Sequence, residues 1–373
     1  MRALLPGATL GILGGGQLAR MMALEARRMG YRVAVLDPDP AGPAAQVSDH
    51  CEQGAFDDAE AALRLAERSD VLTLDTEHIP AELLDELEAI APVRPNASIL
   101  RIVQDRLEQR RFLDANGLPQ TPHASVPEER SLAAATEAVG FPSILKSRRS
   151  GYDGKGQARL ESRADLEDAW RAVDAPSVLE AFVDFEKEIS VLLARDLRGN
   201  VSFYEIPENT HVRHILHTSR VPARIPEKLA EEARVLGKRI ADALEHVGMM
   251  AIEMFVTRSG GLLVNEIAPR THNSGHYTFG ACATSQFEQH VRAVCGLPLG
   301  DPKLLSPAVM VNLLGDLWRD GAPTFESVLA SPNARLHLYG KSKPHPGRKM
   351  GHVLVLDEDL DRAIALAESF SSR

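Results

Sequence analysis

The first hundred residues alternate short apolar runs with segments of helical spacing. Gly30 lies where the first helical segment ends, and glycine is a typical stop signal there. Strands that alternate with helices form parallel sheets covered on both faces, so this region predicts a Rossmann-like domain. The apolar pattern predicts strands over 9–13, 33–36 and 71–74, and helices over 17–29 and 57–68.

The pattern changes beyond Pro92 and Pro95, which mark a domain boundary. We expect a multidomain α/β and α+β protein, whose last unit is small, β-rich and packed on the core. The later elements are a charge-rich helix over 99–116, strands over 143–147 and 177–182 around a helix over 162–172, hairpin-like segments over 188–223, a long helix over 226–246, a tight hairpin of 249–256 with 262–267, and strands over 309–314 and 351–356. The expected domains are 1–100, 101–178, 179–300 and 301–373.

Composition and charge exclude several classes of protein. The 373 residues carry 42 Lys and Arg against 52 Asp and Glu, which gives a net charge of −10. The chain has no basic block of the kind that binds nucleic acid. Its three cysteines are scattered without a CxxC pair, which argues against a disulfide framework or a zinc site and favours the cytoplasm. No apolar run approaches the length of a membrane span, so we expect no membrane partner.

A glycine turn after the first strand is a candidate anion site. Gly14-x-Gly16-x-x-Ala19 loosely fits the dinucleotide fingerprint, and Asp37 lies about 20 residues further on, where a ribose-binding acid is expected. Glycines between a strand and a helix let backbone N–H groups approach an anion. A nicotinamide or flavin, another phosphate ligand, and a turn with no ligand all remain open.

A second glycine-rich segment, SGYDGKGQ over 150–157, follows Lys146 at the end of a strand. Such a loop can fold over a polyphosphate while the lysine supplies a fixed positive charge. It is not a Walker A loop, because no Gly-Lys-Ser/Thr follows at the right spacing. The alternative is an ordinary solvent-exposed loop.

Glu253 and Glu266 are expected to face each other across the tight hairpin. A two-residue turn at Ser259-Gly260 pairs them directly, whereas a three-residue loop would break the pairing. Like charges directly opposite are destabilising unless a cation lies between them, and Mg²⁺ favours one or two carboxylates with phosphate oxygens. The alternative is two solvated acids, against which we count the apolar neighbours expected on the same face: Ala251, Phe255, Leu262 and Val264.

Two polar clusters follow. The segment APRTHNSGH over 268–276 sets many hydrogen-bond donors beside the proposed metal site, which suits an anionic substrate. The segment YGKSKPHPGRKMGH over 339–352 is basic within an acidic protein, so it either attracts a phosphorylated substrate or is simply solvated.

Together, the lysine strand, the glycine-rich loop and the paired glutamates resemble the ATP-grasp superfamily. Within it, the strings SGYDGKGQ, NEIAPRTHNSGH and PGRKMGH resemble the N5-carboxyaminoimidazole ribonucleotide synthetases, over nearly the whole chain. Many ATP-grasp enzymes have Asn two positions after the second Glu; this chain has Ala268, which fits the purine enzyme. The resemblance implies a Rossmann-like first domain, two central ATP-grasp domains, and ATP-dependent carboxylation of 5-aminoimidazole ribonucleotide with bicarbonate.

The resemblance also implies roles for individual residues. ATP would contact Arg106, Lys146, Gly151, Tyr152, Asp153, Gly154, Lys155, Gly156, Gln157, Glu180, Ala181, Phe182, Val183, Glu188, His211, Asn265 and Glu266. Mg²⁺ (or Mn²⁺) would bind Glu253 and Glu266. The catalytic residues would be Tyr152, Asp153, Arg270, His272, Asn273, Lys341 and Arg348, with Asp153 as the proton acceptor. The ribonucleotide would contact Gly15, Gly16, Gln17, Leu18 and Glu77.

Further expectations come from the same resemblance: a homodimer and a pathway link to the mutase that rearranges the carboxylated product. Rival functions are another carboxylate–amine ligase, such as a formate-dependent glycinamide ribonucleotide formylating enzyme or a biotin carboxylase. An NAD-dependent oxidoreductase would leave the paired glutamates unexplained, and a nucleotide sensor would bind ATP without turnover.

Overall fold

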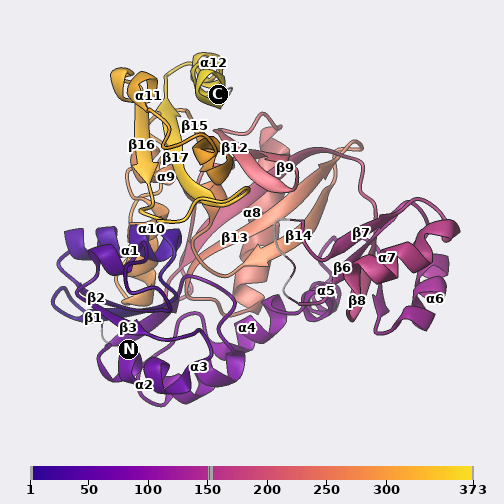
Figure 1. Cartoon of the computed structure of the whole chain (residues 1–373), viewed down its shortest axis with the longest axis horizontal. Coiled ribbons are helices and arrows are strands. Elements are labelled where there is room, and N and C mark those ends of the chain that lie inside the picture. Colours follow the sequence, from indigo (N-terminus) through magenta and orange to yellow (C-terminus); the bar gives the residue numbers. More distant parts are fainter. Residues whose placement is uncertain (1–2, 150, 152–153, 372–373) are drawn as a thin grey trace.

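The computed structural model describes residues 3–149, 151 and 154–371. A long antiparallel sheet runs through the middle of the molecule, with a parallel sheet beside it, a small sheet at one end and the C-terminal strands at the other (Figure 1). This architecture confirms the expected multidomain α/β and α+β fold. Within the described ranges, no helix is both long and apolar enough to cross a membrane.

The N-terminal sheet has the order β3-β2-β1-β4 and is parallel throughout, as the alternating pattern predicts. Strands β1, β2 and β4 are largely buried apolar runs, as expected where helices cover both faces of a sheet, whereas the edge strand β3 is mostly polar. The strands are β1 (Thr9–Leu13), β2 (Arg32–Asp37), β3 (His50–Gln53) and β4 (Val71–Leu74), and the main helices are α1 (Gln17–Arg28), α2 (Ala59–Glu67) and α3 (Ala81–Glu88).

One predicted helix is wrong in detail. The segment 99–116 forms two helices, α4 (Ala97–Val103) and α5 (Arg106–Ala115). The Asp105 carboxylate accepts hydrogen bonds from the backbone N–H groups of Leu107 and Glu108, so it caps a new helix where the pattern predicts continuity. Arg106 is therefore the first residue of α5.

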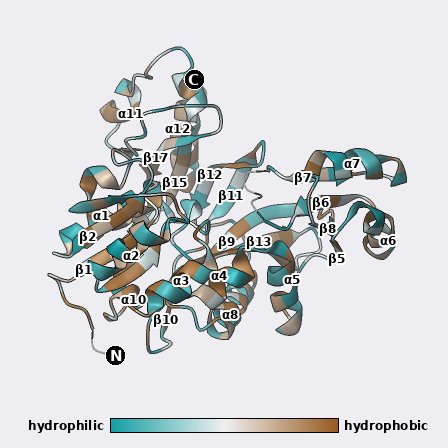
Figure 2. Cartoon of the chain, turned by 60° about the horizontal axis from the view of Figure 1, so that its bottom comes forward, coloured by the Kyte–Doolittle hydropathy of each residue, from teal (hydrophilic) through white to brown (hydrophobic). Residues whose placement is uncertain are grey.

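The small sheet has the order β5-β8-β6-β7, and α6 (Glu129–Val139) and α7 (Leu166–Val173) pack on one face of it. Its strands are β5 (His123–Val126), β6 (Ser143–Ser147), β7 (Gln157–Leu160) and β8 (Ser177–Ala181). β6 and β7 are the two strands that flank the glycine-rich segment. In Figure 2, α7 is largely teal, in agreement with its charged, exposed face.

The central sheet has nine strands in the order β14-β13-β9-β11-β12-β15-β17-β16, with β10 beside β9. α8 (Glu227–Ala243) covers one face, and the segment around α9 (Thr278–Ala281) packs on the other. The strands are β9 (Phe185–Arg195), β10 (Val201–Phe203), β11 (Glu208–Val212), β12 (Ile215–Val221), β13 (Gly248–Thr257), β14 (Leu262–Ala268), β15 (Ala308–Leu314), β16 (Ala334–Leu338) and β17 (Lys349–Leu356). The C-terminal strands thus extend the central sheet, because β15 pairs with β12.

Several contacts join the N-terminal domain to the rest, and two of them involve the helix that follows α9. Apolar residues of α1 pack against α10 (Gln286–Val294), and Met22, Phe287 and Val291 belong to the same buried cluster. His290 of α10 is buried, and its Nε2 lies 2.6 Å from the Thr73 hydroxyl of β4. Its Nδ1 accepts a hydrogen bond from the Met249 N–H of β13. These contacts hold the carboxyl ends of β1 and β4 against the central sheet.

Three histidines, of which His276 and His352 are buried and His337 is half-buried, join the C-terminal strands to the segment after β14. The rings of His337 and His352 stack with centroids 4.5 Å apart, and the His276 ring lies 5.0 Å from that of His352. The Tyr339 hydroxyl lies 2.8 Å from His352 Nδ1. Burial lowers the pKa of His276 to about 3 and that of His337 to about 4, and it lowers the pKa of His352 well below its usual range. All three are therefore neutral at pH 7.

These histidines predict a free energy of unfolding that falls as the pH decreases from about 7.5 to about 5.5. The unfolded chain protonates them near pH 6.5 while the folded chain does not, so each costs up to about 1.4 kcal/mol per pH unit below that value. Urea unfolding at several pH values measures this dependence. His337→Gln should flatten it, and a free energy that stays constant or rises towards pH 5.5 would contradict the prediction.

Candidate active site

The carboxylate of Glu180, at the end of β8, is buried among three cationic side chains. Its Oε1 lies 2.6 Å from Arg106 Nε and 2.8 Å from Arg110 Nε, and its Oε2 lies 2.8 Å from Lys146 Nζ. Residues four apart share a face of a helix, so α5 presents both guanidinium groups to this carboxylate, while β6 presents the lysine. Arg110, which the sequence analysis missed, is fully buried.

This cluster carries a surplus of positive charge. Burial alone would raise the pKa of Glu180, but Arg106, Arg110 and Lys146 hold it well below its usual range. Burial, together with the charge of Arg106, lowers the pKa of Lys146 to about 8. One carboxylate thus faces three cations, and the excess of two positive charges suits an anionic ligand such as a polyphosphate.

The two arginines also connect α5 to the β13–β14 hairpin. Arg106 Nη2 donates to Asn265 Oδ1 at 3.2 Å, and its Nη1 lies 4.0 Å from Glu266 Oε2. Arg110 donates to the backbone carbonyl groups of Val264 and Asn265 at 3.0 and 2.5 Å. A single cluster therefore joins α5, the small sheet and the central sheet.

Glu253 and Glu266 pair across the hairpin, as predicted, but the loop between the two strands is not the expected two-residue turn. The turn is a three-residue loop between Thr257 and Gly261, which alone would misalign the two glutamates. A β-bulge at Asn265 adds one residue to β14 and restores the alignment, because Met254 pairs with Val264 and Glu253 with Glu266.

The bulge also corrects the expected set of flanking residues. Val264 and Leu262 do not share the face of Glu266; both are buried in the core on the opposite side of the sheet. On the glutamate side, Ala251 pairs with Ala268, and Phe255 stacks on Phe185 with ring centroids 4.7 Å apart.

The electrostatics of the glutamate pair favour a bound cation. Burial and the adjacent Glu266 charge raise the pKa of Glu253 to about 7. His272 Nε2 lies 3.6 Å from Glu253 Oε1. Within the described part of the chain, no group of three or more His, Cys, Asp or Glu side chains forms a metal cage. Mg²⁺ typically takes only one or two protein carboxylates and fills its other positions with phosphate and water.

The other predicted nucleotide residues surround the same region. Glu188 Oε2 lies 2.5 Å from His211 Nδ1, and this hydrogen bond raises the pKa of His211 against the effect of burial. The segment from Ala181 to Val183 links β8 to β9, and the Phe182 N–H donates to the Pro142 carbonyl group. The Arg159 guanidinium lies 4.1 Å from the centroid of the Phe182 ring.

The glycine-rich segment is described at Gly151 and from Gly154 to Gln157, while Tyr152 and Asp153 lie outside the described residues. Gly156 has φ +67°, and a Cβ there would lie 2.5 Å from the Ser147 hydroxyl. The Gly156 carbonyl group accepts a hydrogen bond from the Ser147 N–H. The far end of the segment is thus held closely against β6, beside Lys146.

A second, polar cavity of about 240 Å³ lies beside the glutamate pair. It brings together the N-terminal domain and the segment after β14, and its lining residues are Gln17, Leu18, Asp75, Thr76, Arg270, His272, Asn273 and Lys349. Arg270 Nη2 forms an ion pair of 2.7 Å with Glu77, and the amides of Asn273 and Asn312 of β15 hydrogen-bond to each other.

The sequence analysis missed Asp75, Thr76 and Lys349. Asp75 and Thr76 directly follow β4, at the carboxyl edge of the parallel sheet. Ligands of open α/β sheets bind at this edge, so the position of these two residues in the sequence could have indicated them. Lys349 belongs to the basic segment in which only Lys341 and Arg348 were chosen. Lys341 Nζ lies 5.7 Å from the centroid of the Tyr339 ring, and burial lowers its pKa to about 8. Arg348 donates to the Lys343 carbonyl group at 2.5 Å.

The glycine turn after β1 is already occupied by carboxylates of the chain itself. The Gly15 N–H donates to Asp37, and the N–H groups of Gly16 and Ala19 donate to Asp75, at 2.7 to 2.8 Å. These amides are not available to a phosphate, and the Asp37 carboxylate is turned towards the chain rather than towards a ribose. Of the residues predicted in this segment, Gln17 and Leu18 line the cavity.

Comparison with known proteins agrees with this geometry. The ribonucleotide synthetase preATP-grasp domain family matches residues 7–104, the ATP-grasp domain family matches 111–287, and the phosphoribosylaminoimidazole carboxylase C-terminal domain family matches 308–366. The chain is therefore an ATP-grasp protein.

Relatives over the full length narrow the assignment. An N5-carboxyaminoimidazole ribonucleotide synthase of Brucella melitensis is 47% identical over 94% of this chain and 97% of its own. The crystal structure of an ADP complex of an N5-carboxyaminoimidazole ribonucleotide synthetase has a TM-score of 0.94 and 44% identity, and it covers 100% of this chain and 98% of its own. The Aspergillus clavatus synthase, in complex with ADP and 5-aminoimidazole ribonucleotide, has a TM-score of 0.91 and 32% identity over 99% and 98%. This chain belongs to the N5-carboxyaminoimidazole ribonucleotide synthase family.

The buried cluster predicts a large effect of Glu180→Gln. A neutral amide would leave three cations close together, so the free energy of unfolding should fall by about 3–5 kcal/mol, as is typical for a broken buried ion pair. Urea unfolding measures the loss. Asp184→Asn is the matched control, because its ion pair with Arg258 is exposed and should contribute little to stability. Equal stabilities of the two variants would contradict the assigned role of Glu180.

Proposed function

We propose that the protein joins bicarbonate to 5-aminoimidazole ribonucleotide at the expense of ATP, forming N5-carboxyaminoimidazole ribonucleotide, ADP and phosphate in de novo purine synthesis. The observation that carries the proposal is the juxtaposition of two sites. The cationic cluster and the glutamate pair form one, and the polar cavity forms the other; His272 belongs to the cavity and lies 3.6 Å from Glu253.

Bicarbonate chemistry explains why the two sites adjoin. Bicarbonate is a poor electrophile, so one of its oxygens first attacks the γ-phosphorus of ATP, which forms carboxyphosphate and releases ADP. The amine of the ribonucleotide then attacks the carbon of carboxyphosphate, or of CO₂ released from it, and phosphate leaves. The anhydride hydrolyses in water, so the acceptor must be bound within reach before it forms.

The nucleotide is assigned to the cationic cluster. Arg106 and Lys146 would neutralise phosphate charge, and the segment from Gly151 to Gln157 would cover the phosphates. The linker from Glu180 to Val183 would bind the adenine, with Glu188 and His211 at the ribose. Mg²⁺ held by Glu253 and Glu266 would relieve the repulsion that raises the pKa of Glu253, and it would neutralise charge on the transferred phosphate.

The cavity is assigned to bicarbonate and the ribonucleotide. The side chains of Arg270 and Asn273 are fixed by contacts with Glu77 and Asn312. Gln286 holds the backbone of His272, and the imidazole Nδ1 lies 2.9 Å from the Ser274 hydroxyl, so all three side chains offer hydrogen-bonding groups at defined positions. Tyr152 and Asp153 complete the proposal from the family resemblance, with Asp153 as the proton acceptor of the amine. Lys341 and Arg348 would approach the same centre from the C-terminal strands. The homodimer, the cytoplasmic location and the link to the mutase are proposed on the same resemblance.

Release of ADP from Mg·ATP tests the function, with bicarbonate and 5-aminoimidazole ribonucleotide added singly and together. Release that requires the ribonucleotide, with formation of its carboxylated product, is expected. Release with glycinamide ribonucleotide and formate would instead move the protein to the rival ligase function. No release under any combination would leave a protein that only binds nucleotide.

Glu266→Ala should abolish turnover, because it removes one of the two proposed metal ligands and leaves the Arg106 cluster in place. Steady-state ADP release over a range of Mg²⁺ concentrations measures the effect. Glu232→Ala, on the exposed side of α8, is the control and should retain wild-type turnover. Retained cleavage of Mg·ATP by the Glu266 variant would rule out the metal assignment.

A further inference from the structure

The hairpin between β11 and β12 turns through two residues in the left-handed region. Val212 pairs with Ile215, so Arg213 and His214 alone form the turn, with φ of 52° and 66°. This is the conformation that Asn-Gly or Gly-Gly adopts at little cost, whereas residues with larger side chains are strained in it. Strain of this kind persists where the side chain has a use.

The side chain of His214 is in contact with the glycine-rich segment. A Cβ added to Gly154 would lie 2.6 Å from His214 Cβ and 2.7 Å from its ring atoms Cγ and Cδ2. His214 Nδ1 also lies 3.4 Å from Gln157 Nε2. The backbone of Gly154 therefore packs directly against His214, at a spacing that only glycine permits.

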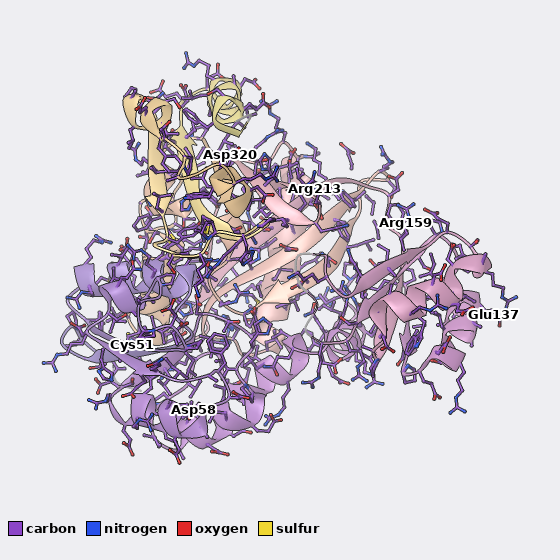
Figure 3. The ribbon with its side chains drawn as sticks, viewed as in Figure 1. Cys51, Asp58, Glu137, Arg159, Arg213 and Asp320 are labelled. Carbon is purple, nitrogen blue, oxygen red and sulfur yellow. The ribbon has the colours of Figure 1, made fainter. Side chains whose placement is uncertain are left out.

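This contact spans two separate sheets. Gly154 and Gln157 belong to the β6–β7 connection of the small sheet, and His214 belongs to the central sheet. Figure 3 shows Arg213 on the side of the central sheet towards Arg159 of β7. The same hairpin carries His211, three residues earlier, beside Glu188. One short hairpin thus contacts both the proposed ribose site and the proposed phosphate-covering segment.

We propose that His214 is a positioning residue that holds the segment from Gly154 to Gln157 against the central sheet when nucleotide is bound. The inference rests on the proposed function only in that the nucleotide is ATP. The imidazole of His214 acts by packing and by its hydrogen bond to Gln157, and it contacts neither ATP nor the reacting atoms. Arg213 shares the strained turn without contacting the segment in this way, so it supplies the matched control.

The test compares His214→Gly with Arg213→Gly. Both changes place glycine where the backbone favours it, so both variants should fold. His214→Gly should raise the KM for Mg·ATP roughly fivefold, the order expected for the loss of one hydrogen bond, with a smaller change in kcat. In the presence of Mg·ATP, trypsin should also cleave it after the exposed Lys155 several times faster than wild type. Arg213→Gly should match wild type in both measurements.

Two further variants sharpen the test. His214→Asn tolerates the left-handed backbone and can still hydrogen-bond to Gln157, so it should recover part of the KM. Gly154→Ala should be less harmful in a His214→Gly background than in wild type, because the overlap with the imidazole is removed. Equal KM and cleavage rates for His214→Gly and Arg213→Gly would overturn the proposal. Absence of ADP release in wild type would instead count against the proposed function, while the cleavage assay with Mg·ATP would still report on this contact.

Discussion

The buried carboxylate of Glu180 is the interaction on which the rest of the site depends. Without it, Arg106, Arg110 and Lys146 would repel one another in a region with little water. With it, the cations of α5 and β6 converge on one carboxylate. A net positive charge remains, which suits the proposed binding of phosphate. The ion pairs of Glu180 thus stabilise the fold and also position the cations for the proposed binding of phosphate.

A second constraint is the bulge at Asn265. It aligns the two glutamates despite a hairpin loop of three residues, and it turns the Asn265 side chain towards Arg106. A bulge adds a residue to one strand and redirects the side chains around it, which is why bulges are common beside active sites. Here it couples the proposed metal ligands to the cationic cluster, and His272 extends the connection from Glu253 to the polar cavity.

The sequence predicted the fold class and the hairpin because those features rest on local apolar periodicity and on pairing between near neighbours. It predicted the glutamate pair from a two-residue turn, whereas the pair forms because a bulge compensates for a three-residue loop. It failed where a carboxylate side chain bonds to backbone N–H groups in a way that apolar periodicity does not show. Asp105 divides one predicted helix in two, and Asp75 takes the amides of the glycine turn from nearly 60 residues away. Arg110 lies in a charge-rich helical segment, and only its tertiary partners show that it is buried. The roles of Tyr152 and Asp153 stay predictions.

The central claim is that the geometry delivers the γ-phosphate of ATP to bicarbonate, beside a bound amine acceptor. Bicarbonate labelled with ¹⁸O tests this claim most directly, with the released phosphate analysed by mass spectrometry. If carboxyphosphate forms, its bridging oxygen comes from bicarbonate, and each released phosphate should carry one ¹⁸O atom whenever carboxylated product is made. Phosphate whose oxygens come only from ATP and water would contradict the account.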